Sequence, residues 1–146
     1  IPRPWLRRSE AMQTRAERSG ALMVILLVYA GATLLHYSHN AAFLHEYPNM
    51  PEWLTPARVC AAWVVLTAVG LAGYLLFRWR HRFAGLVLLA TYAAGGLDGL
   101  THYGLAPLSA HTPAMHLTIG LEAAMALLVL AAVARLMLQR QHHVEE

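Results

Sequence analysis

Histidine is the residue type whose number and placement in this sequence indicate chemistry. The chain has nine histidines, and His36, His102 and His116 lie within or at the ends of long apolar stretches. Asp98 and Glu122 are the carboxylates that fall inside those stretches. Imidazole and carboxylate groups bind zinc, copper and iron in proteins, and they also carry protons. This combination predicts a transition-metal site in an apolar part of the molecule.

The spacing of these residues places several of them on shared helical faces. Residues three or four positions apart lie on the same side of an α-helix, which groups His36 with His39 and Asn40. The same rule groups Asp98 with His102. We therefore expect metal ligands from three helices at a similar depth. The expected ligands are His36, His39, Asp98, His102 and His116.

Glu122 occupies a different position from these ligands. It follows Pro113 by nine residues, or about 13 Å along a helix, and it lies about 120° round the helix from His116. One ion could not easily contact both residues. We interpret Glu122, together with His111 and Asn40, as a hydrogen-bond partner of the ligands or as part of a proton relay.

The Asp-x-x-x-His pair followed by a further histidine resembles the metal-binding segment of the C subunit in copper membrane monooxygenases. The residues that carry the resemblance are Asp98 and His102, with His116 or His111 as the third ligand. The resemblance is confined to this short segment and implies no family for the whole chain. It implies that copper can be held with this spacing inside a membrane.

The elements that must position these residues are membrane-spanning helices. Hydrophobic residues make up 58% of the 146 residues and charged residues only 13%, whereas soluble domains carry about 25% charged residues. A span needs about 20 mostly apolar residues, and four stretches qualify. They are Ala21 to Ser38, Ala57 to Phe77, Phe83 to Tyr103 and Pro113 to Leu138. Thr55-Pro56 and Thr112-Pro113 are typical of helix starts, with threonine at the N-cap.

Arginine sets the expected orientation. The chain has eleven basic residues, all arginine, and ten of them lie at one end of the predicted spans while Arg58 lies at the other. By the positive-inside rule, both termini are cytoplasmic. Because the linkers are short, we expect an all-α integral membrane protein, a four-transmembrane-helix antiparallel bundle with its termini inside, in a bacterial inner membrane.

We expect three parts along the chain. Residues 1–20 form a basic cytoplasmic segment, either a helix on the inner leaflet or a disordered tail. Residues 21–138 form the four-helix membrane domain, and residues 139–146 form a cytoplasmic tail. Gly95 and Gly99 form a GxxxG pair that favours close helix packing in the third span.

Three functions remain open from the sequence. The first is a membrane metalloprotein with a copper, zinc or iron site near the outer face, as a subunit of a larger membrane complex. The second is a subunit that binds haem or (bacterio)chlorophyll through the same histidines. The third is an accessory subunit in which these side chains only form hydrogen bonds between helices.

The expected partners are the lipid bilayer and other membrane subunits. Nucleic acid is not expected, because the arginines lie at segment ends. The sequence assigns no reaction.

Overall fold

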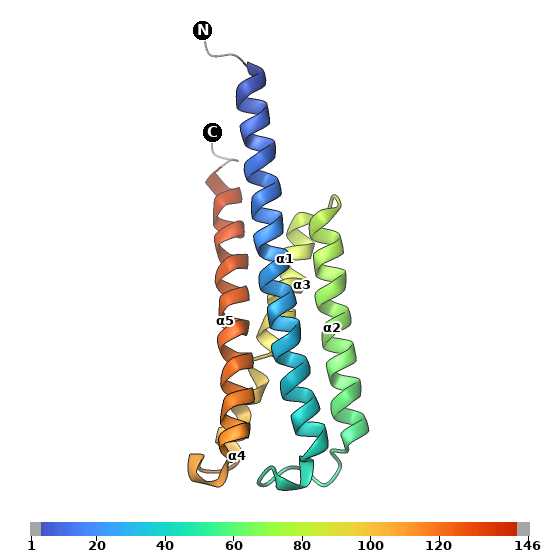
Figure 1. Cartoon of the computed structure of the whole chain (residues 1–146). Helices are drawn as coiled ribbons and strands as arrows, with labels where there is room; N and C mark the ends of the chain where they lie inside the picture. The colour runs from blue at the N-terminus through green and yellow to red at the C-terminus, as the bar shows by residue number, and fades with distance from the viewer. Residues whose placement is uncertain (1–3, 143–146) are drawn as a thin grey trace.

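A computed structural model describes the backbone of residues 4–142 and the side chains of residues 19–139. All regular structure in this part of the chain is helical. Four long helices lie side by side (Figure 1). They are α1 (Pro4–Ala42), α2 (Pro56–Arg78), α3 (Arg82–Gly95) and α5 (Pro113–His142). The shorter elements are η1 (Leu44–Glu46), η2 (Asp98–Thr101), α4 (His102–Leu105) and η3 (Leu108–Ala110).

Four helical segments are long and apolar enough to cross a membrane, as the sequence predicts. They are Ser19–Ala42, Pro56–Arg78, Arg82–Leu105 and Pro113–Gln139. The threonine N-caps are confirmed, because Thr55 Oγ1 accepts a hydrogen bond from the Arg58 amide at 3.3 Å. Thr112 Oγ1 accepts one from the Met115 amide, also at 3.3 Å. A hydroxyl followed by proline therefore fixes the start of both helices.

The N-terminal segment is continuous with the first span. Helix α1 begins at Pro4 and no break in it marks the expected boundary at residue 20. The arginine side chains of the basic segment, on which the expected contact with the inner leaflet rests, precede Ser19 and lie outside the described side chains.

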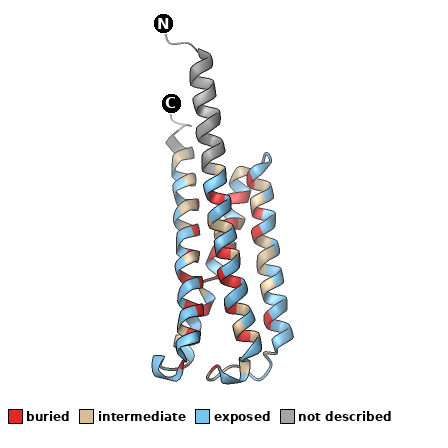
Figure 2. Ribbon diagram, in the orientation of Figure 1, coloured by how far each residue is buried: buried red, intermediate tan, exposed pale blue. Residues whose placement is uncertain are grey.

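The exterior of the bundle is apolar, and its core is formed by the buried residues along the facing sides of the helices. Buried residues lie on the sides of the helices that face one another, while exposed positions face outward (Figure 2). Large apolar side chains such as Leu27, Val65 and Leu117 are among those outward positions. Helix α2 packs on α1 and α3, and α5 packs on the same two helices. Together with the length of the four helices, this apolar exterior is compatible with an integral membrane protein.

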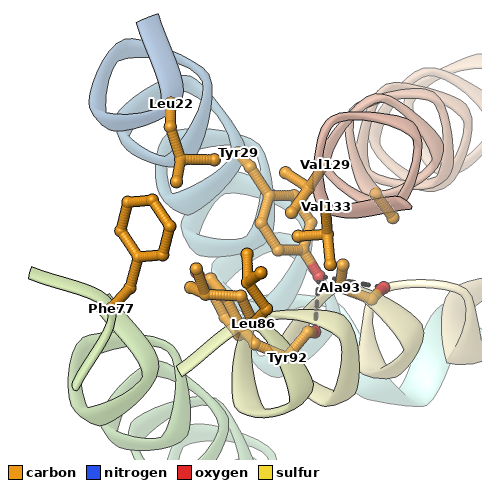
Figure 3. Close-up of a cluster of buried hydrophobic side chains, with 10 residues drawn as sticks. Leu22, Tyr29, Phe77, Leu86, Tyr92, Ala93, Val129 and Val133 are labelled. Carbon is orange, nitrogen blue, oxygen red and sulfur yellow. Dashed lines mark hydrogen bonds between the residues drawn. The ribbon is translucent and has the colours of Figure 1, made fainter. Parts of the chain in front are cut away.

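The third span differs from the continuous helix that we expected. Helix α3 ends at Gly95, and the chain continues through the 3-10 turn η2 before α4 begins at His102. The Tyr29 hydroxyl of α1 donates hydrogen bonds to the Tyr92 carbonyl at 2.9 Å and the Ala93 carbonyl at 3.4 Å (Figure 3). Gly96 leaves the space that this hydroxyl occupies. Carbonyls released at the end of the helix are thus satisfied by a neighbouring side chain.

Helices α2 and α3 approach each other closely at Gly73 and Gly85, which are not part of the GxxxG pair. A Cβ added to Gly73 would lie 3.0 Å from the Leu89 amide nitrogen and 3.1 Å from the Gly85 carbonyl oxygen. Gly95 and Gly99 do not share a neighbour. Gly95 faces Leu66 of α2, whereas Gly99 faces side chains of α1 and α5.

We expect Gly73→Ala to destabilise the protein, because its new methyl group would meet backbone atoms that cannot move aside independently. Overpacking of this kind lowers the free energy of unfolding by about 1–3 kcal/mol. Gly31→Ala in α1 is the matched control, since nothing lies within 4 Å of its added Cβ. Reversible unfolding in mixed detergent micelles measures both variants. Equal stability of Gly73→Ala and Gly31→Ala would contradict the close packing of α2 on α3.

Candidate functional site

The buried polar side chains gather towards the end of the bundle that holds the 43–55 and 106–112 linkers, which we call the loop end. His36 and Asn40 come from α1, and His102 is the first residue of α4. Thr118 and Glu122 come from α5, and His111 lies in the linker just before it. The buried polar set is completed by Thr33 of α1. Three separate segments thus contribute to one polar interior.

His36 and Glu122 form the deepest pair in this interior. His36 Nε2 lies 3.6 Å from Glu122 Oε2, and the two residues are 3% and 0% exposed. Neither carboxylate oxygen has a hydrogen-bond partner among the described residues, and the same holds for His36 Nδ1. A buried carboxylate without hydrogen bonds is costly unless a cation or a proton compensates it. The pair is therefore incompletely satisfied by the protein alone.

Gly99 lies directly beside this pair. A Cβ added to Gly99 would lie 3.1 Å from Glu122 Oε2 and 3.4 Å from His36 Nε2. Any larger residue here would press on both groups. The glycine in η2 thus preserves the space next to the carboxylate and the imidazole.

His102 adds a second buried imidazole at the same level. Its ring centroid lies 5.8 Å from that of His36, and its Nε2 lies 3.1 Å from Asn40 Nδ2. Because the amide nitrogen is a donor, His102 Nε2 accepts this bond and Nδ1 carries the hydrogen. His102 Nδ1 has no partner among the described residues. The Tyr47 ring covers His102 at a centroid distance of 4.8 Å.

A second histidine group lies nearer the linkers. The Tyr103 hydroxyl and His116 Nδ1 are 2.9 Å apart, and the His111 ring lies 5.8 Å from that of His116. His111 Nδ1 donates to the Pro107 carbonyl at 3.1 Å, which leaves Nε2 as a buried acceptor with no partner among the described residues. His116 therefore faces Tyr103 and His111 rather than Glu122, in agreement with the angle expected from the sequence.

His39 and Tyr47 close the site at the start of the linker after α1. His39 Nδ1 lies 2.8 Å from the Tyr47 hydroxyl, and the Tyr47 side chain is buried. Burial raises the pKa of Tyr47 above its ordinary value, so this phenol stays protonated at neutral pH. The sequence marks Tyr47 only as an aromatic residue near an interface. Tyr47 lies in the linker beyond the end of α1, so helical periodicity could not have placed it beside His102.

Asp98 does not join the other expected ligands. Its side chain is exposed while His102 is buried, although we expected the two to share one helical face. The reason is the end of α3 at Gly95, because the 3-10 turn that follows advances about 120° per residue rather than 100°. Asp98 consequently faces a groove on the outside of the bundle.

The structure thus brings together His36, Asn40, His102 and Glu122, and it places His39, His116 and Asp98 around or outside that group. Among the described side chains, no three His, Cys, Asp or Glu residues already converge on a position for one ion. No protein-family model, curated protein or solved structure matches this chain.

Proposed function

We propose that this protein is an integral membrane protein whose buried His36–Glu122 pair binds a transition-metal ion, with copper, zinc and iron as the candidates. The observation that carries the proposal is the unpartnered Glu122 carboxylate, fully buried and 3.6 Å from His36 Nε2. Glu122 belongs to the span Pro113–Gln139. A charged group near a bilayer centre costs about 2.5–3.5 kcal/mol on insertion scales, so it normally marks a functional site.

The separation of the two groups suits a shared ion. Ligand atoms bound about 2.1 Å from a tetrahedral ion lie about 3.4 Å from one another, close to the observed separation. His36 and Glu122 supply one nitrogen and one oxygen donor. His102 is the third donor in this proposal, and its ring must turn from Asn40 towards the pair to reach the ion. Gly99 supports the proposal because it keeps side-chain atoms away from the two donor atoms.

We further propose that the four spans form an antiparallel bundle in a bacterial inner membrane, with both termini in the cytoplasm. The support is the distribution of arginine, since ten of eleven lie at the end opposite the loop end. The histidine groups then face the outer side. In this arrangement His111 and His116 lie nearer the outer face than the His36–Glu122 pair. We place the protein as one subunit of a larger membrane complex.

Metal content tests the proposed site. His36→Ala and Glu122→Ala should each remove most of the metal bound by the purified protein, because each deletes a donor atom. Gly99→Ala should weaken the affinity by about 10–100-fold, the range found when groups that position ligands are altered. Elemental analysis and titration with a competing chelator measure these losses.

The controls for the metal test are histidines and glycines away from the site. His45→Ala and His81→Ala alter exposed histidines. Gly120→Ala is the control for Gly99→Ala, because nothing lies within 4 Å of a Cβ added to Gly120. All three should keep the native metal content. Equal metal in every variant, or a metal-free native protein, would contradict the proposal. An absorbance spectrum typical of a porphyrin would favour the haem or (bacterio)chlorophyll alternative.

Cysteine labelling tests the proposed orientation. In a Cys60→Ser background, a cysteine at exposed Glu52 should react with an impermeant maleimide added to intact cells. A cysteine at exposed Arg80, in the turn between α2 and α3, should react only after the inner membrane is opened. The reverse pattern would place the histidine groups on the cytoplasmic side.

A further inference from the structure

An apolar groove on the outside of the bundle contains one carboxylate. Its walls include Ala61, Ala62 and Val65 of α2 and Ala94 and Gly95 of α3. Asp98 lies in the same groove, and its side chain is exposed. Four of the nine groove residues are alanine or glycine, which would allow another helix backbone to approach closely at those positions, and the remaining walls are Val65, Leu66 and Val69 of α2 and Tyr37 of α1. The surface therefore combines the two features that transmembrane helix contacts use, small residues and one strongly polar group.

Asp98 lies within the span rather than at its end. It precedes Leu105, the last residue of the span Arg82–Leu105, by seven residues. The intervening chain is the 3-10 turn η2 and the short helix α4, which rise about 1.5–2.0 Å per residue. Asp98 therefore lies about 10–14 Å inside the end of the span, which is too deep for routine solvation by water. An exposed carboxylate at this depth requires a cationic or hydrogen-bonding partner.

No ion pair or hydrogen bond is found for the Asp98 carboxylate among the side chains described in residues 19–139. The histidine–carboxylate pairs there are His36–Glu122 and His45–Glu46, and Tyr37 of α1 lines the same groove as Asp98. Arg58 is the basic residue at this end of the bundle, and its guanidinium instead donates to the Trp53 carbonyl at 2.7 Å. The requirement for a cation is therefore not met by the bundle itself.

A second copy of this chain would not supply the cation at this depth. Its Arg58 lies only two residues from Pro56, at the end of a span, and donates to the Trp53 carbonyl. Arg78, Arg82 and Arg135 lie towards the opposite end of the spans, and there is no lysine in the chain. We propose that the groove receives a transmembrane helix of a different protein that carries an arginine or lysine at the depth of Asp98. Charge complementarity selects this partner, and the alanine and glycine walls allow its backbone to approach. This contact is separate from the His36–Glu122 pair, since Asp98 lies outside that group.

The test uses the full chain in lipid vesicles with synthetic transmembrane peptides as probes. One peptide is a leucine–alanine helix with a single arginine placed about 10 Å from its outer end, and the second has leucine at that position. A dye on a cysteine at exposed Ser109, in the Cys60→Ser background, reports association by energy transfer to a labelled peptide. The arginine peptide should bind the native protein about fivefold to thirtyfold more tightly than the leucine peptide.

Two variants make the result specific. Asp98→Asn should abolish the preference for the arginine peptide, whereas Glu52→Gln, which alters an exposed carboxylate in the linker, should leave it unchanged. Asp98→Asn should also keep its full metal content, so failure here is distinguishable from failure of the metal proposal. Equal binding of both peptides, binding of neither, or a preference that survives Asp98→Asn would overturn the inference. Self-association that depends on Asp98 would identify a second copy as the occupant instead.

Discussion

The Glu122 carboxylate imposes the constraint on which the rest of the loop end depends. It lies between α1, η2 and α5 with no exposed surface, and among the described side chains His36 is the one that forms an ion pair with it. In an apolar interior such a group must be neutralised by a proton or by a cation. The neighbouring side chains are consistent with this need, since His36 presents a nitrogen to the carboxylate and Gly99 leaves room beside it.

The break in the third span is what makes this arrangement possible. A continuous helix through residues 96–102 would carry Gly99 and His102 round at 100° per residue, whereas the 3-10 turn changes their directions. Gly99 then faces the His36–Glu122 pair, and His102 turns inward to meet Asn40. Tyr29 stabilises the break by donating hydrogen bonds to the carbonyls at the end of α3. Structure at mid-bundle therefore determines the chemistry available nearer the linkers.

Much of the fold could be predicted from the sequence because hydropathy and helix caps act locally. The four spans follow from their length and apolar composition, and the starts of α2 and α5 follow from Thr-Pro pairs.

The site was predictable only in part. His36, Asn40, His102 and Glu122 stood out as polar residues in apolar surroundings. The outward direction of Asp98 was not predicted, because helical periodicity was extended across Gly95 and Gly96, where the helix ends. The adjacent glycines Gly95 and Gly96 are the signal in the sequence for this helix end, whereas our prediction uses Gly95 only as part of the GxxxG packing pair. Tyr47 depends on the path of the linker after α1, which no periodic pattern specifies.

Infrared spectroscopy of the Glu122 carboxyl group tests most directly whether a bound cation compensates it. The spectrum of the Glu122→Gln protein, subtracted from that of the native protein, isolates this one group. With metal bound, the account predicts the paired stretching bands of an ionised carboxylate, and removal of the metal by a chelator should replace them with the carbonyl band of a protonated acid. A protonated acid in both states, or ionised bands that the chelator leaves unchanged, would contradict the account.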